Sequence, residues 1–230
     1  MKGGKEMKKR TKLADRVMPR YTRGEEQMNM ITHIVGGGLG VMALFLCVGR
    51  AAVHHNGWGA WTAIIYGLAM ITLYTMSSVY HGLRDSMGKR VMQVMDHCTI
   101  YALIAGTYTP IVLAGIRPEN PALGWGLFAL EWSLAALAIT LTAIDLKKYN
   151  VFSMICYIGM GWAVIPFAGL VIDLLGAGCF WLLLGGGVAF TIGAILYGMG
   201  KKKKWMHSVF HIFVVIGTVL QFFAIYFYVM

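Results

Sequence analysis

Apolar runs of about 20 residues recur along the whole chain, separated by short stretches of turn-forming or charged residues. An α-helix rises 1.5 Å per residue, so a run of that length spans the hydrocarbon core of a bilayer, which is about 30 Å thick. The runs cover residues 29–53, 58–81, 92–116, 121–145, 151–173, 175–198 and 206–230. The pattern therefore predicts an all-α, polytopic membrane protein with seven transmembrane helices.

The boundaries between the runs carry residues that end helices or form turns. They lie at Asn56-Gly57, Arg84-Asp85, Arg117-Pro118, Lys147-Lys148 and Lys201 to Lys204. The boundary near Leu174, with Asp173 as its polar marker, is the weakest. One helix over both neighbouring runs would need about 48 residues, too many for a single crossing. Pro110 and Pro166 lie inside runs and are expected to kink their helices.

Composition supports a membrane protein and excludes an ordinary soluble domain. Hydrophobic residues make up 58% of the chain and charged residues only 13%, whereas soluble domains carry about 25% charged residues. The four cysteines all lie inside apolar runs without the short paired spacing of a metal or redox motif. We expect them to be free thiols that pack as small apolar residues.

The positive charges determine a predicted orientation. The net charge of +10 suggests nucleic-acid binding, but all except two of the 20 lysine and arginine residues, Arg50 and Arg117, fall on one side of a seven-span topology. Cytoplasmic segments carry such an excess. The sequence therefore predicts a cytoplasmic N-terminus, an outside C-terminus and a place in the cell membrane, plasma or inner. Membrane lipids are the expected partners, and neither nucleic acid nor a soluble protein partner is indicated.

The chain divides into two predicted parts. Residues 1–24 form a basic cytoplasmic segment, expected to be disordered and held near anionic headgroups, and residues 25–230 form the membrane domain. A cleaved signal peptide does not fit this beginning. The basic stretch is followed by Glu25 and Glu26 and then by a full-length span without a cleavage signal.

Ionisable residues inside the spans are the candidates for function, because burying them in hydrocarbon costs several kcal/mol unless they are paired. Two pairs are spaced by four residues and so share a helix face: Ser77 with His81, and His207 with His211. His81 ends the second span at the cytoplasmic side, where Asp96 begins the third span and His207 the seventh. If these spans are neighbours, three imidazoles and one carboxylate converge in the inner leaflet.

Three imidazoles suit Zn²⁺, whose tetrahedral coordination leaves a fourth position for water in catalytic sites. Zinc-bound water has a pKa of about 7 and can act as a nucleophile. Asp96 would orient that water or accept its proton, and Ser77 would donate a hydrogen bond to the carboxylate or to an oxyanion. A single intramembrane histidine is more often a hydrogen-bonding residue between helices. The set of three at one depth favours a metal.

Other polar residues near the first span remain open to two interpretations. Glu26, Asn29 and His33 are spaced by three and four residues and share one helix face. They either support the metal site or cap and solvate the start of the helix. His97 follows Asp96 directly and so points about 100° away from it on a helix, and we interpret it as a spectator.

Glu131 lies about halfway along the fourth span, between Leu130 and Trp132. One hypothesis is that it is protonated or hydrogen-bonded between helices. The other is that it serves a lipid or proton cavity.

Four motifs, taken in order, resemble the hemolysin III family, the bacterial branch of the progestin and adiponectin receptor superfamily. They are Glu25 to Asn29 with Thr32-His33, Ser77 to His81, Asp96-His97 with Ala105 to Pro110, and His207-x-x-x-His211. The resemblance runs from about Tyr21 to the C-terminus. It implies seven helices, a cytoplasmic N-terminus, a zinc ion held by His81, His207 and His211, and a water-mediated role for Asp96 with Ser77 nearby.

The resemblance implies three functions. Eukaryotic relatives look like receptors with ceramide-hydrolysing capacity, alkaline ceramidases belong to the wider superfamily, and bacterial members are named for lysis of red cells or linked to membrane lipid homeostasis. Our first hypothesis is a zinc-dependent hydrolase of membrane lipid amide or ester bonds. The alternatives are a sensor or homeostasis factor with structural zinc, and a pore-forming cytolysin. The cytolysin hypothesis is weakened because the chain is too hydrophobic to travel as a soluble monomer.

Overall fold

The computed structural model describes residues 11–200 and 203–230, and within these residues it is all-helical, with seven helical segments long and apolar enough to span a membrane. The predicted seven-span fold is therefore confirmed. The elements are η1 (Leu13–Asp15), α1 (Arg23–Val53), α2 (Gly57–Gly82), α3 (Met87–Pro110), η2 (Ile111–Ile116), α4 (Pro121–Ile144), α5 (Asn150–Gly161), η3 (Ile165–Phe167), α6 (Ala168–Leu175), α7 (Ala177–Gly200) and α8 (Met206–Tyr228).

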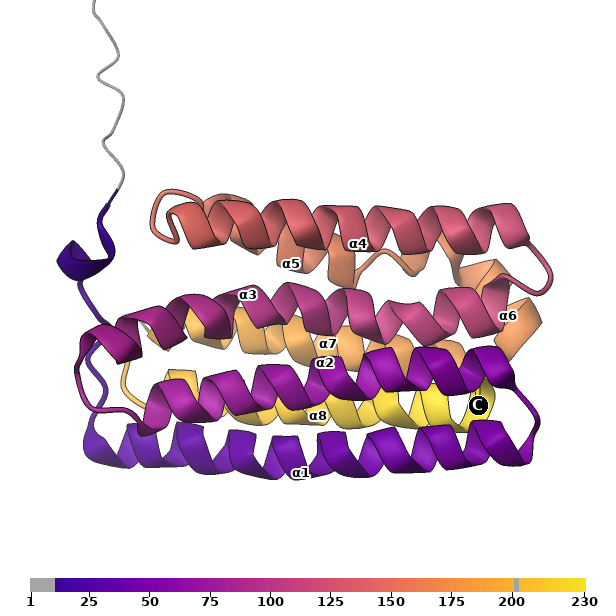
Figure 1. Cartoon of the computed structure of the whole chain (residues 1–230), viewed down its shortest axis with the longest axis horizontal. Helices are drawn as coiled ribbons and strands as arrows, with labels where there is room; N and C mark the ends of the chain where they lie inside the picture. Colours follow the sequence, from indigo (N-terminus) through magenta and orange to yellow (C-terminus); the bar gives the residue numbers. More distant parts are fainter. Residues whose placement is uncertain (1–10, 201–202) are drawn as a thin grey trace, which may run out of the picture.

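The long helices lie side by side along one axis (Figure 1). The helix α1 packs against α2 and α8, α2 packs against α3, and α7 packs against α8. The start of α1, the end of α2 and the start of α8 meet at the same end of the bundle (Figure 1). This arrangement brings together the helix ends that carry the candidate histidines.

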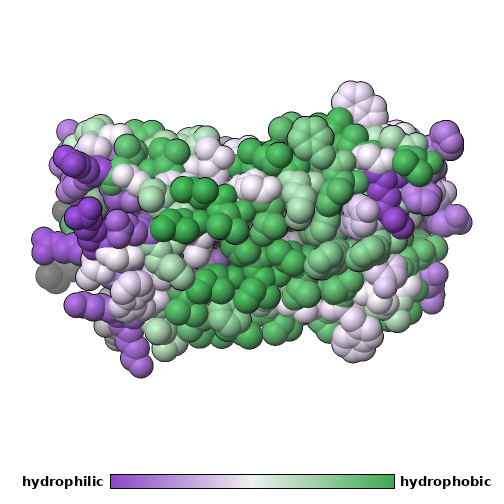
Figure 2. Space-filling view, turned by 90° about the horizontal axis from the view of Figure 1, so that it is seen from below, coloured by the Kyte–Doolittle hydropathy of each residue, from purple (hydrophilic) through white to green (hydrophobic). Residues whose placement is uncertain are grey.

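On the face shown in Figure 2, an apolar belt covers the middle of the bundle, and hydrophilic residues gather at both ends. Large side chains in the belt are exposed, among them Ile34, Phe45 and Ile195. A soluble protein rarely exposes so large a continuous apolar surface. The belt therefore has the distribution expected of a surface that contacts lipid chains.

Basic residues of the described loops and of the first turn of α3 lie at the end where α1 begins, which we call the basic end. They are Arg84, Lys89, Arg90, Lys147, Lys148, Lys203 and Lys204, whereas Arg50 and Arg117 lie at the opposite end. Lys201, Lys202 and residues 1–10 of the predicted N-terminal segment lie outside the described residues. Residues 11–22 of that segment run across the basic end, where the amide of Thr11 donates to Asp145.

Both prolines inside the spans coincide with departures from α-helical geometry. Pro110 ends α3 and is followed by the π-helix η2, and Pro166 lies in the 3₁₀ turn η3 that separates α5 from α6. Proline has no backbone N–H and clashes with the preceding helical turn, which accounts for the break before Pro166. The fifth span is therefore made of two short helices rather than one.

A tyrosine compensates for the break in the fifth span. The Tyr108 hydroxyl donates to the Gly161 carbonyl and accepts from the Val164 amide, both at 3.0 Å. These backbone groups lie where the helical ladder is interrupted, and in a bilayer such groups need a partner inside the protein.

The carboxyl of Glu131 faces this break. Glu131 is only 2% exposed and borders a small hollow with Tyr108, Val164 and Val171. Among residues 11–200 and 203–230, neither of its carboxyl oxygens has a hydrogen-bond partner. Its surroundings are thus apolar apart from the tyrosine.

We predict that a phosphatase reporter fused after Met230 is active, since it would lie outside the cytoplasm. The same reporter fused after Lys148 should be inactive, because that loop belongs to the basic end, which the charge distribution assigns to the cytoplasm. Whole-cell phosphatase activity of the two fusions is the measurement. The reverse pattern would invert the predicted orientation.

We also predict that Glu131→Gln does not destabilise the protein. A charged carboxylate without a partner is costly in hydrocarbon, whereas glutamine has the same shape and no charge. The Tm in detergent should stay within about 4 °C of the wild-type value or rise, and Glu131→Lys should lower it by more than that. If Glu131→Gln instead lowers the Tm as much as Glu131→Lys does, the carboxyl group itself is required.

Candidate metal centre

Three histidines meet at the basic end of the bundle. His81 lies in the last turn of α2, and His207 and His211 lie in the first two turns of α8. One ring nitrogen from each lies within 4.8 Å of the others. All three side chains are buried. The structure therefore brings together the three histidines that the sequence spacing and topology predict to converge.

The geometry of these nitrogens fits a shared metal ion. The Nε2 atoms of His207 and His211 are 3.1 Å apart. Two imidazole ligands at 2.0–2.1 Å in a tetrahedral site would be about 3.3 Å apart. Among the residues described, Nε2 of His81 has no hydrogen-bond partner although it is buried. A buried polar atom without a partner is costly, and a metal ion would satisfy it.

A carboxylate sets which nitrogen of His81 faces the site. His81 Nδ1 donates to Glu26 Oε2 at 2.6 Å, and Lys89 Nζ donates to the other Glu26 oxygen at 2.7 Å. Because Nδ1 carries the proton, Nε2 keeps its lone pair free for a metal. Carboxylate partners of this kind orient metal-binding histidines.

The other two residues on the same face of α1 also lie against the histidines. Asn29 Nδ2 is 3.4 Å from His81 Nδ1. The His33 ring centroid is 3.8 Å from that of His211, and His33 also contacts Tyr74 edge-on at 5.0 Å. Asn29 and His33 are both buried. The face predicted from their spacing is therefore directed at this site rather than at solvent.

Glu25 holds the start of α8 in place. It forms a capping box with Thr22, in which the Thr22 side chain accepts from the Glu25 amide and Glu25 accepts from the Thr22 amide at 2.8 Å. Its other oxygen accepts from the Trp205 amide at 2.6 Å. Trp205 has a φ of 67° and directly precedes α8. Glu25 thereby fixes the helix that carries His207 and His211.

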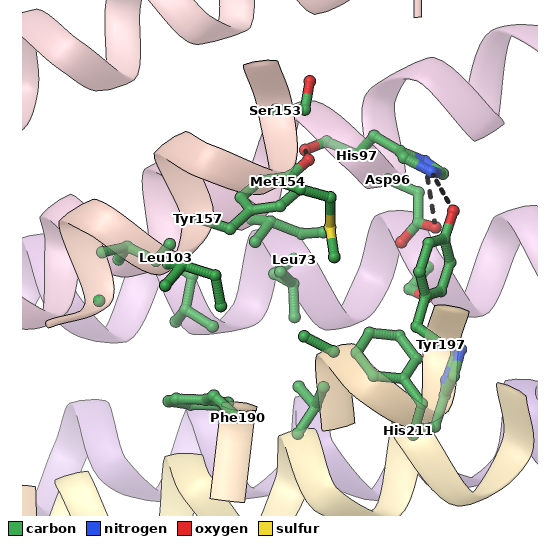
Figure 3. A pocket seen from close by; sticks show the side chains of 18 of the residues that line it. Leu73, Asp96, His97, Leu103, Ser153, Met154, Tyr157, Phe190, Tyr197 and His211 are labelled. Atoms are coloured by element: carbon green, nitrogen blue, oxygen red, sulfur yellow. Dashed lines mark hydrogen bonds and ion pairs between the residues drawn. The ribbon is translucent and has the colours of Figure 1, made fainter. Parts of the chain in front are cut away.

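A cavity of about 160 Å³ extends from His207 and His211 into the bundle. Asp96, His97 and Tyr197 lie at one end of the part shown, near His211, and apolar side chains such as Leu103 line the part farther away (Figure 3). An apolar cavity of about 150 Å³ can hold a small apolar molecule such as benzene. The cavity thus joins a polar end to an apolar interior.

The predicted catalytic residues both border this cavity. Asp96 lines it from α3 and is half-buried, with Oδ2 4.0 Å from His97 Nδ1. Ser77 lines it from α2, one turn before His81, and its hydroxyl is buried without a hydrogen-bond partner among the described side chains and backbone. Both groups are open to a molecule in the cavity.

His97 lines the cavity as well, although it follows Asp96 directly. Its Nδ1 donates to the Gln93 carbonyl at 2.8 Å, and its Nε2 is 3.4 Å from the Tyr197 hydroxyl. The cavity is wide enough here for two successive residues of α3 to border it. The offset of about 100° between Asp96 and His97 on the helix is therefore not sufficient to make His97 a spectator of the site.

Two residues of the site are absent from the sequence-based prediction. The Tyr21 ring stacks on the His207 ring with centroids 4.7 Å apart and an interplanar angle of 17°. Burial, together with the nearby Tyr197 and Glu26, raises the pKa of Tyr21 well above its usual value, so its hydroxyl stays protonated. Lys89 donates to Glu26, but in the sequence it contributed only to the charge distribution that predicts the orientation.

The sequence contains one local pattern that could have indicated a packing role for Tyr21, and none that indicates a role for Lys89. Tyr21 immediately precedes the capping box Thr22-x-x-Glu25, a position where a hydrophobic residue often packs against the first turn of the helix. The spacing of Lys89 has no comparable pattern.

Comparisons with known proteins agree with the motifs. The family model described as haemolysin-III related matches residues 21–222. The chain is 36% identical over 207 residues to Hemolysin-3 of Bacillus cereus, covering 90% of this chain and 92% of that protein. It is also 36% identical over 209 residues to a Hemolysin-3 homolog of Bacillus subtilis (strain 168), covering 90% and 96%.

A more distant similarity reaches animal proteins. The chain is 26% identical over 192 residues to the human monocyte to macrophage differentiation factor, covering 79% of this chain and 77% of that protein. This relative supports the wider progestin and adiponectin receptor superfamily. With a family match over most of its length and two relatives at 36% identity, the chain belongs to the hemolysin III family.

Proposed function

We propose that this protein is a zinc-dependent hydrolase that acts on amide or ester bonds of membrane lipids. The observation that supports the proposal best is a cluster of three buried imidazoles, two of which, His207 and His211, line the polar end of a largely apolar cavity. The proposal includes a cytoplasmic N-terminus and a metal site near the cytoplasmic face of the cell membrane, as the charge distribution suggests.

The donor atoms favour zinc. The site offers three imidazole nitrogens, and His₃ sets with an open fourth position are typical of catalytic zinc. Bound there, zinc would supply a Lewis acid and an activated water at neutral pH. His81, His207 and His211 would hold it, with Glu26 orienting His81 and Asn29 and His33 packed around the ligands.

The cavity favours a lipid substrate. Its walls beyond the polar end are apolar, with Leu73, Leu103 and Phe190 among them (Figure 3). The part of an acyl chain nearest its head could lie along these walls, which would bring the carbonyl group to the histidines. A small polar substrate would leave the apolar walls without a role.

The chain's own residues can carry the proton transfers. Hydrolysis adds water across the C–N or C–O bond and releases a carboxylic acid together with an amine or an alcohol. Asp96 would accept the proton of the attacking water and pass it to the leaving nitrogen or oxygen. The Ser77 hydroxyl, which has no hydrogen-bond partner among residues 11–200 and 203–230, would donate to the carbonyl oxygen as negative charge develops on it.

We predict about one zinc ion per purified wild-type chain and almost none in His207→Ala, because three ligands are the usual minimum for protein-bound zinc. The matched control is His55→Ala, which removes an exposed histidine from the loop at the opposite end. Metal content by mass spectrometry is the measurement. A wild-type protein without zinc, or a His207→Ala variant that retains it, would refute the metal site.

Asp96→Ala separates a catalytic from a structural zinc. If Asp96 transfers protons, the variant should lose about 10²–10⁴-fold in kcat while keeping its zinc and its Tm. Hydrolysis of a long-chain ceramide in proteoliposomes, followed by release of fatty acid, is the assay.

Two outcomes would argue against the hydrolase. In a structural site with Asp96 in the fourth position, Asp96→Ala would lower zinc content and Tm together. Wild-type protein that contains zinc but releases no fatty acid from amide or ester lipids would leave only the sensor hypothesis for the metal.

A further inference from the structure

Residues 11–22 cover the histidines at the basic end. Both Pro19 and Tyr21 line the mouth of the cavity. The Tyr21 ring stacks on His207, and its centroid is 5.8 Å from that of His81. The segment therefore contacts metal-site residues on two helices, α2 and α8, while belonging to neither.

The beginning of this segment is attached to the loop between α4 and α5. The Thr11 amide donates to Asp145 Oδ2 at 2.8 Å, and Asp145 Oδ1 accepts from the amides of Lys147 and Lys148, both at 3.1 Å. Burial raises the pKa of Asp145, but these hydrogen bonds and the nearby Arg16 outweigh it and hold the pKa below its usual value. Asp145 is thus a charged, strong acceptor.

A second attachment joins the segment to α3. Arg90 Nη1 donates to the carbonyls of Ala14 and Arg16, at 2.9 and 2.5 Å. The Arg16 side chain is itself buried, with only 7% of the residue exposed. The segment is thus attached to α3 and the α4–α5 loop at one end and contacts α2 and α8 at the other, so it bridges the cavity mouth.

These contacts differ from those of a basic tail held at lipid headgroups. Electrostatic attraction to anionic lipid needs exposed side chains and does not depend on backbone geometry. Here backbone groups of Thr11, Ala14 and Arg16 are bonded to the bundle, and an aromatic ring contacts a histidine of the site.

We propose that residues 11–22 form a lid that shields the metal site from water-soluble molecules at the basic end, and that the Tyr21 ring closes this lid over His207. The inference rests on the proposed metal site but does not depend on hydrolysis. It gives residues 11–22 a defined structural role beside the site.

Access can be measured by removing bound zinc with two chelators. The zinc-loaded full chain in lipid nanodiscs is treated with EDTA, which is charged and water-soluble, or with 1,10-phenanthroline, which is uncharged and enters apolar cavities. Arg90→Ala should speed extraction by EDTA by about tenfold or more, the scale of losing one hydrogen bond to a charged group. Tyr21→Ala, which removes the ring stacked on His207, should speed it by about fivefold, the scale of losing one aromatic pair. The rate of zinc extraction by phenanthroline should change by less than about threefold. This chelator does not need to pass the lid, and opening the lid changes access from water without changing the affinity of the site for zinc.

Two matched variants distinguish the lid from simpler explanations. Tyr21→Phe keeps the ring and should keep extraction by EDTA slow. Arg84→Ala removes an exposed arginine from the loop that precedes Arg90 and should behave as wild type. Equal acceleration by both chelators would show that the variants weaken zinc binding rather than open a lid, and an unchanged EDTA rate in Tyr21→Ala and Arg90→Ala would also overturn the proposal.

A second measurement needs no metal. Trypsin should cut after the buried Arg16 slowly in wild type and at least about tenfold faster in Arg90→Ala, because cleavage requires the attached segment to open. If wild type and Arg90→Ala are cut at the same rate, the segment is not held over the site. Protein that binds zinc and passes both tests but hydrolyses no lipid would contradict the proposed function and leave the lid intact.

Discussion

Two neighbouring carboxylates in the first turn of α1 hold the site together. Glu25 accepts from the Trp205 amide and so fixes the start of α8, while Glu26 accepts from His81 at the end of α2 and from Lys89 at the start of α3. Adjacent residues on a helix point in different directions, so one turn of α1 can reach several neighbouring helices. The approach of the histidines to one another depends on these charge-assisted bonds.

Packing inside the bilayer supports the same arrangement by other means. Lipid is as apolar as leucine, so helices in a membrane associate through close packing and hydrogen bonds rather than through the hydrophobic effect. Gly36 of α1 leaves room for the Tyr74 ring of α2, where a Cβ would collide with it. The Tyr74 hydroxyl then donates to Thr218 of α8 at 2.8 Å. One tyrosine thus joins the helices that carry the three histidines.

The cavity and the lid are two consequences of this packing. The bundle stays open beside α3 and α7, where Asp96 and Tyr197 face the interior, and residues 11–22 lie across its mouth. Polar groups that would be costly in hydrocarbon are gathered where the cavity meets the basic end. The apolar remainder offers space for a chain-like molecule. The site therefore lies at a boundary between lipid-like and water-like surroundings.

The length and number of the apolar runs were sufficient by themselves to determine seven spans, because a helix in a bilayer must cover a fixed thickness. Topology placed His81, His207 and His211 at one side of the membrane, and the four-residue spacing placed His207 and His211 on one helix face. That α2 and α8 bring all three together was decided by the tertiary structure. Only the tertiary structure decided that Glu25 binds α8, that Lys89 completes the Glu26 pair and that Tyr21 covers His207. Such contacts join residues far apart in sequence through side-chain directions that no local pattern encodes.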